Sequence, residues 1–87
     1  MPTICSLEGI DIKMYCAPKE HSPAHFHVYY GEFKAVINID TLSLLKGYLP
    51  PVKLKLVIKW ANRHKEELID NWNLVMQSQL PNKISKN

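Results

Sequence analysis

The sequence predicts an α+β fold, with an antiparallel sheet of three to four strands and one long C-terminal helix packed on one face. Residues 10–15 and 26–39 alternate apolar and polar side chains, a pattern that is typical of half-buried strands. Residues 52–77 instead repeat their apolar side chains with the period of an amphipathic helix. Because this helix needs a cover for its apolar stripe, we expect it to pack on the apolar face of the sheet.

The chain of 87 residues is long enough for one hydrophobic core and too short for a second catalytic domain. We expect a single α+β domain over residues 1–79 and a polar tail over residues 80–87 that frays. With 46% hydrophobic and 22% charged residues, the composition is that of a globular protein. The net charge of +3 is compatible with a nucleic-acid or an acidic protein partner and does not decide between them.

The N-terminal residues 1–5 lack a basic segment followed by a long apolar run, so we expect no secretory signal. No apolar run approaches the length of a membrane span, and we expect a cytoplasmic protein without membrane contact. In that compartment Cys5 and Cys16 are expected to be free thiols with structural roles, because their spacing matches no zinc-binding or redox pair.

The first predicted strand covers residues 10–15. Its apolar side chains are expected to face the core: Ile10, Ile12 and Met14. Its other side chains share the opposite face: Asp11, Lys13 and Tyr15. Residues 17–23 are expected to form a loop, because their two prolines remove amide donors that a strand or helix would use.

Residues 26–30 and 33–39 form the clearest hairpin in the chain, with Gly31-Glu32 as a turn whose leading glycine suits a primed turn. Pairing Tyr30 with Phe33 places the apolar side chains Phe26, Val28, Tyr30, Phe33, Ala35, Ile37 and Ile39 on one face. A one-residue slip would turn one strand's apolar side chains toward water. The opposite face then carries His25, His27, Tyr29, Lys34, Val36 and Asn38.

Asp40-Thr41 is expected to be a turn, followed by a third hairpin strand or an irregular extended segment over residues 42–49. Lys46-Gly47 interrupts the alternation there, which indicates a bulge or an edge position.

One helix is predicted from about residue 52 to residue 77. Its apolar stripe consists of Leu54, Val57, Ala61, His64, Leu68, Trp72 and Val75. Trp60 falls at the margin of this stripe, where it indicates an interface, whereas Trp72 is explained by core packing. His64 is expected to be a core imidazole bonded to a backbone carbonyl or a loop side chain, on the opposite side of the sheet from the other histidines.

A series of short motifs is spread along the chain: Pro2-Thr3-Ile4, the segment from His21 to His27, Tyr30-Gly31, Trp60, His64, Glu67-Leu68 and Trp72. In these features the chain resembles a widespread bacterial family of small domains that is known only as a domain of unknown function. Ala24 departs from the proline that the family usually has there. The resemblance implies a small protein partner encoded nearby, since family members often lie beside another small domain in arrangements similar to toxin–antitoxin modules. It implies no catalytic residues.

The three clustered histidines are candidate ligands of a metal ion. His25 and His27 are two positions apart on a strand, so both project from one face, and His21 would join them if the loop folds back. A structural zinc site usually needs four ligands, and only Cys16 and Glu20 are close additions. We therefore expect no cofactor and keep a divalent metal on the three histidines as the minor alternative.

Acid–base chemistry on a phosphodiester is a further hypothesis for the same face. One histidine would accept a proton, the other would donate one, and a lysine would stabilise the developing charge, which makes His25, His27 and Lys34 the catalytic candidates. The binding candidates are His21, Lys13, Tyr15, Tyr29 and Asn38. The outer face of an antiparallel sheet is ordinarily polar, however, so a plain solvated surface explains the same residues.

Two function hypotheses follow. The first is a small cytoplasmic interaction module that binds a protein partner, as one component of a toxin–antitoxin-like pair. The second is a small nucleic-acid-directed enzyme, a histidine acid–base ribonuclease, or a metal-binding protein that uses His21, His25 and His27. An exposed apolar patch beside Trp60 favours the first, and a cleft that holds the three histidines and a lysine favours the second. The sequence is also compatible with self-association and does not fix the oligomeric state.

Overall fold

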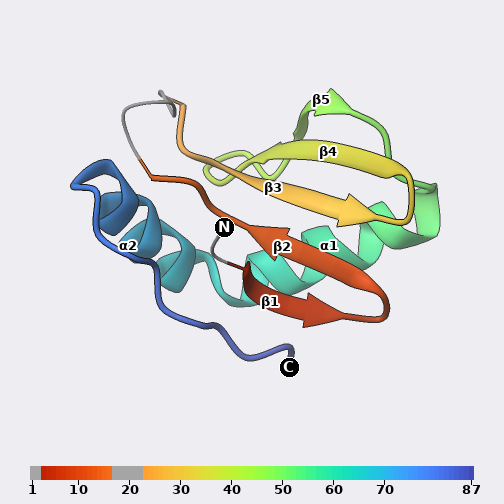
Figure 1. Ribbon diagram of the computed structural model, residues 1–87. Helices are drawn as coiled ribbons and strands as arrows, with labels where there is room; N and C mark the ends of the chain where they lie inside the picture. Colours follow the sequence, from red (N-terminus) through yellow and green to blue (C-terminus); the bar gives the residue numbers. More distant parts are fainter. Residues whose placement is uncertain (1–2, 17–22) are drawn as a thin grey trace.

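The computed structural model describes residues 3–16 and 23–87, and the described chain forms an antiparallel sheet with two helices (Figure 1). The elements are β1 (Thr3–Leu7), β2 (Ile10–Lys13), β3 (His25–Tyr30), β4 (Phe33–Asn38), β5 (Leu44–Gly47), α1 (Pro51–Arg63) and α2 (Lys65–Met76). The sheet order β1-β2-β3-β4-β5 follows the chain, so each strand pairs with its neighbours in sequence. The predicted α+β class is confirmed. Most of the loop expected over residues 17–23 lies outside the described residues.

Within the described residues the sheet has five strands, so the prediction of three to four was wrong. The additional strand is β1, which pairs with β2 in an antiparallel register that sets Leu7 opposite Ile10. Glu8 and Gly9 join the two strands with φ of 50° and 78°. Positive φ at both central residues is the requirement of a type I′ hairpin turn, which a glycine makes accessible.

The central hairpin has the predicted register. Tyr30 pairs with Phe33 and Phe26 with Ile37, and Gly31 begins the turn with φ of 57°, as a primed turn requires. The strand residues predicted to face the core are buried, with the exception of Tyr30 and Phe33, which are half-buried near the turn. Their stacked rings, with centroids 6.4 Å apart, close that end of the sheet.

The strand β5 lies at the edge of the sheet, and its pairing with β4 shifts register between Val36 and Ile37. Both features agree with the expected bulge or edge position. Gly47 ends the strand with φ of 80°, and the amide of the next residue, Tyr48, donates to the carbonyl of Lys34 at 2.9 Å. The end of β5 is therefore held tightly against β4.

Gly47→Ala is expected to lower the free energy of unfolding by roughly 2–4 kcal/mol, because the left-handed backbone and the crowding both oppose a side chain. An added Cβ would lie 2.1 Å from the carbonyl oxygen of Lys34. Gly31→Ala is the matched control, since its φ is also positive but no atom lies within 4 Å of the added Cβ. Urea unfolding of both variants would measure the difference, and equal losses would rule out a steric role for Gly47.

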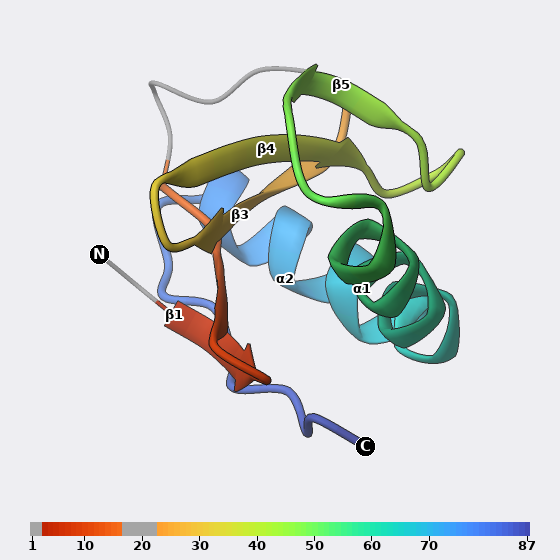
Figure 2. The ribbon, with the colours of Figure 1, turned by 90° about the vertical axis from the view of Figure 1, so that its right-hand side faces the viewer.

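The prediction of one long helix was wrong, because the helical segment divides at His64. This residue has φ of −116° and ψ of 25°, ends α1 and precedes α2. Glu66 and Glu67 lie in the first turn of α2, where negative charge is favourable to a new helix start. The division lets both helices follow the same curved face of the sheet, which Figure 2 shows. In the described part of the chain, neither helix is long and apolar enough to cross a membrane.

The core lies between this face and the helices. The predicted stripe is buried at Val57, Ala61, Leu68, Trp72 and Val75. The placement of Trp60 at the margin was wrong: its side chain is 0% exposed, and its indole Nε1 donates to the carbonyl of Ser85 at 2.8 Å.

The C-terminal residues 80–87 form neither helix nor strand, yet they lie against the domain and differ from the expected frayed tail (Figure 1). The amide of Ile84 donates to the carbonyl of Ile4 at 2.8 Å, and the Ile84 side chain is buried. The buried Asn71 side chain donates to the carbonyl of Asn82 and accepts from its amide, at 2.8 and 2.9 Å. The tail thus supplies hydrogen-bond partners to the buried side chain of α2, which would destabilise the fold if it were left unpaired.

Candidate functional site

The site predicted from the sequence lies on the face of the sheet opposite the helices, which we call the outer face. Because Phe26 and Val28 are buried in the core, alternation along β3 places His25, His27 and Tyr29 on the outer face. A row of directly opposed residues crosses four strands there: Lys13, His27, Val36 and Lys46. A neighbouring row consists of Asp11, Tyr29 and Lys34.

The histidine and tyrosine side chains of the outer face contact one another. The ring of His27 lies 5.3 Å from that of His25 and 4.6 Å from that of Tyr15, centroid to centroid, in edge-to-face arrangements. The hydroxyls of Tyr15 and Tyr29 form a hydrogen bond of 2.6 Å. His25 also contacts the Trp72 ring at 4.9 Å, so the cluster ends on α2. These contacts join the rings into one cluster.

The two histidines differ in their contacts. Their rings touch edge to face, with centroids 5.3 Å apart. The Nδ1 of His25 lies 2.8 Å from the carbonyl of Pro23, which can only accept, so Nδ1 is the protonated donor. Lys34 is opposite Tyr29, whereas His25 is opposite Asn38, four residues further along β4. The structure therefore groups Lys34 with His27 and separates it from His25.

The remaining predicted binding residues have different surroundings. The ammonium of Lys13 lies 5.2 Å from the centre of the Tyr29 ring, within the range of a cation–π contact. Asn38 has a structural partner instead, because its side-chain oxygen accepts from the amide of Thr41 at 3.0 Å and holds the turn after β4. His21 lies outside the described residues.

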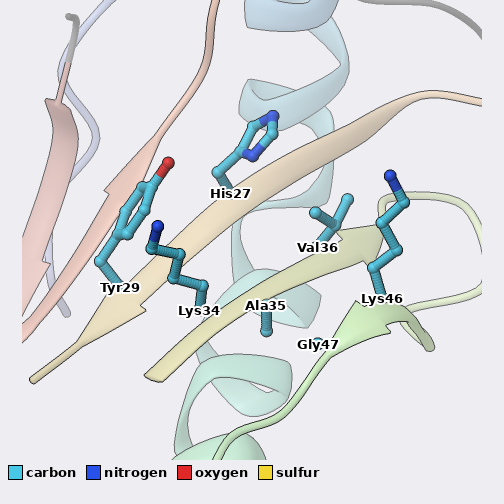
Figure 3. Close-up of a pocket in the computed structure, with 7 residues that line it drawn as sticks. All are labelled: His27, Tyr29, Lys34, Ala35, Val36, Lys46 and Gly47. Atoms are coloured by element: carbon cyan, nitrogen blue, oxygen red, sulfur yellow. The ribbon is translucent and has the colours of Figure 1, made fainter. Parts of the chain in front are cut away.

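A cavity of about 230 Å³ opens on the outer face between β3, β4 and β5. It is lined by His27, Tyr29, Lys34, Ala35, Val36, Lys46 and Gly47 (Figure 3). The side chains of His27, Lys34 and Lys46 project to the same side of the sheet in this view. Lys46 was not among the predicted site residues. The sequence feature that could have indicated its position is the interrupted alternation at Lys46-Gly47, because this interruption marks where β5 ends beside β4.

The metal hypothesis finds no support in the described part of the chain. Residues 3–16 and 23–87 contain no group of three histidine, cysteine, aspartate or glutamate side chains that could hold a metal ion. Cys5 and Cys16 are free thiols, as expected. Burial raises the pKa of the Cys5 thiol, which keeps it protonated and unreactive at neutral pH. The Sγ of Cys16 donates to the carbonyl of Gln79 at 3.5 Å.

His64 lies apart from the outer-face cluster. Its Nε2 faces the carbonyl of Asn87 at 2.7 Å and its Nδ1 faces the Glu67 carboxylate at 2.6 Å. Its ring also contacts Trp60, with centroids 5.3 Å apart. The expected partnership with a backbone carbonyl is confirmed, and the histidine serves to join the helix boundary to the C-terminal tail.

A second candidate surface lies between β5 and α1. There, a groove of about 420 Å³ is lined by Leu44, Tyr48, Leu49, Pro51, Leu54, Lys55 and Ile58, and we call it the β5 groove. Leu44 and Tyr48 of this lining are exposed, and Leu45 and Val52, which adjoin lining residues in the sequence, are exposed as well. A patch of this kind beside Trp60 was the feature that would favour an interaction module; Trp60 is buried, and the exposed apolar side chains lie at the sheet edge instead.

Together these features define a small α+β domain: a meander sheet with helices on one face, a basic, aromatic outer face and an apolar edge groove. The family model described as "Domain of unknown function (DUF4160)" matches residues 9–73, and the chain belongs to this family. The matched range runs from the turn before β2 into α2 and includes both candidate surfaces. No curated protein and no solved structure gave a match.

Proposed function

We propose that this domain is a protein-interaction module that binds a small protein partner through β5 and the β5 groove. The observation that carries the proposal is an exposed edge strand beside an apolar groove. Within the described residues, β5 has a neighbouring strand on one side only, and Leu44, Leu45 and Tyr48 are each at least 40% exposed. Natural proteins usually protect such edges, because an uncovered strand is a template for pairing with another chain.

The form of the surface suits an added strand. In β-strand addition, backbone hydrogen bonds along the edge supply affinity, and pockets beside the edge select side chains of the incoming segment. The β5 groove is such a pocket, and its lining is apolar except for Lys55. We expect the partner to insert apolar side chains there.

Lys55 lines the groove and belongs to a basic helix, α1, which favours an acidic partner. The α1 sequence contains Lys53, Lys55, Lys59 and Arg63 and no acidic residue. A second copy of this chain would bring the same positive charge to the contact, whereas an acidic segment would be attracted and steered to it. The family resemblance supports a partner encoded nearby, as one component of a toxin–antitoxin-like pair in the cytoplasm.

The test is co-expression with the product of the neighbouring gene, followed by calorimetric titration of the purified proteins. Leu44→Asp is expected to weaken binding at least tenfold, because it puts a charge into the apolar groove. Leu80→Asp is the matched control: this leucine is 75% exposed in the C-terminal segment, and its variant should bind like the wild type. Equal binding by both variants, or equal loss in both, would contradict the proposal. Growth of the co-expressing cells would report a toxin–antitoxin relationship separately.

A further inference from the structure

We propose that the outer face binds single-stranded nucleic acid, with Lys13, Lys34 and Lys46 on its phosphates and the cavity beside His27 taking a base or sugar. This site is separate from the β5 groove and does not depend on protein binding there. It rests on the arrangement of positive charge, on the aromatic side chains between the charges and on the form of the cavity.

The positive charge on this face is spread over several strands. Lys13 and Lys46 occupy the two ends of one row across β2, β3, β4 and β5, and Lys34 lies on β4 between them. At about 4.8 Å per strand interval, the row is roughly 14 Å long. That length exceeds a single phosphate group and corresponds to several phosphates along a strand.

Little negative charge opposes these lysines. Asp11 is the one acidic residue among the outward-facing strand residues that the structure describes, and its carboxylate accepts from the Ser6 hydroxyl at 2.7 Å. Lys34 and Lys46 are exposed, so a ligand reaches both without a rearrangement of the fold. A polyanion therefore gains attraction across the row without a matching repulsion.

The cavity offers apolar and aromatic contacts, which suit a base or a sugar rather than a free phosphate. Its lining includes the apolar residues Val36 and Gly47 together with His27 and Tyr29, whereas the Ala35 side chain points to the core face (Figure 3). Aromatic rings beside a positively charged surface are the usual means of binding single strands, because every base has a face that can stack. The Tyr29 ring is held by Lys13 and by the Tyr15 hydroxyl, so it is already positioned before a ligand arrives. Paired bases of a duplex are already stacked and would not reach these rings.

The experiment is fluorescence anisotropy with a labelled 12-nucleotide oligouridylate and the full chain, at several salt concentrations. Lys34→Gln with Lys46→Gln is expected to weaken binding at least tenfold. The same double variant should reduce the slope of log K against log salt by about 1.4, since each single-strand phosphate contact contributes about 0.7. Lys59→Gln with Lys83→Gln removes the same charge from exposed positions on α1 and the tail, and should change affinity less than twofold.

Several outcomes would overturn the inference. Equal weakening by both double variants would show that the oligonucleotide is attracted by net charge alone. An absence of binding at low salt would show that the outer face does not bind single-stranded nucleic acid. Competition by millimolar inorganic phosphate would indicate a single-anion site, and equal binding of duplex RNA would exclude a role for the aromatic cavity. Leu44→Asn makes the β5 groove polar without adding charge beside Lys46, and it is expected to bind the oligonucleotide like the wild type, which separates this site from the β5 groove.

Discussion

Trp60→Ala is expected to lower the free energy of unfolding by about 3–5 kcal/mol, a large part of the 5–15 kcal/mol that stabilises a typical domain. The side chain is fully buried and contacts Phe26 edge to face, with ring centroids 6.2 Å apart. Its indole nitrogen also donates to the Ser85 carbonyl. Truncation removes the aromatic contacts, leaves a cavity between α1 and the sheet, and releases the C-terminal segment from one of its anchors.

Trp60→Phe separates packing from hydrogen bonding in this prediction. Phenylalanine retains much of the buried volume but cannot donate to Ser85, so we expect a smaller loss of about 1–3 kcal/mol. Urea unfolding followed by circular dichroism would measure both variants. An alanine variant as stable as the wild type would place the indole at the surface, as an interface residue rather than a core residue.

The position of Trp60 illustrates what the helical pattern could not reveal. The buried residues of the two helices include two per turn, such as Trp60 with Ala61 and Asn71 with Trp72. The narrower stripe predicted from the sequence left Trp60 at its margin and omitted Asn71. The additional width is covered by the C-terminal segment. There Asn82 pairs with Asn71, Ser85 with Trp60 and Asn87 with His64. That segment contacts the helices mainly through backbone carbonyls, which residue type does not reveal, and so it appeared to be a polar tail.

The strands were predictable where periodicity and turn chemistry agreed. The hairpin of β3 and β4 combines alternation over both strands with a glycine at the turn, and its register is the predicted one. The strand β1 has only five residues, and a polar serine before its last residue gives a weak alternation. Glu8-Gly9 is a two-residue turn between apolar residues, a signal that was overlooked and that would have indicated this strand.

The outer-face residues were also predictable, because alternation assigns them once the core face is known. Their grouping was not, since it depends on tertiary structure. The contact between His25 and Trp72 requires α2 to reach the end of β3, and the cavity beside His27 requires Lys46 to lie across from Val36. The sequence therefore indicated the face of the site and left the arrangement of residues within it undetermined.

Leu68→Ala is expected to cost about 2–5 kcal/mol, because Leu68 is 0% exposed and its truncation leaves a cavity under the sheet. Trp72→Ala should lower stability by a similar amount, since that ring fills the core and contacts His25. Urea unfolding monitored by circular dichroism would measure both losses, and tryptophan fluorescence would report on the core, with Trp60 as its sole source in the Trp72→Ala variant.

Ile69→Ala is the matched control for Leu68, since it removes a side chain of the same composition from the next position of the same helix. Ile69 is 36% exposed, so less apolar area is lost, and alanine has the higher helix propensity. We expect a change within about 1 kcal/mol. If Ile69→Ala were the more damaging substitution, the face that α2 presents to the sheet would be the opposite one. Trp72 would then lie outside the core and its contact with His25 would be lost. The histidine cluster of the outer face would therefore have no contact with α2.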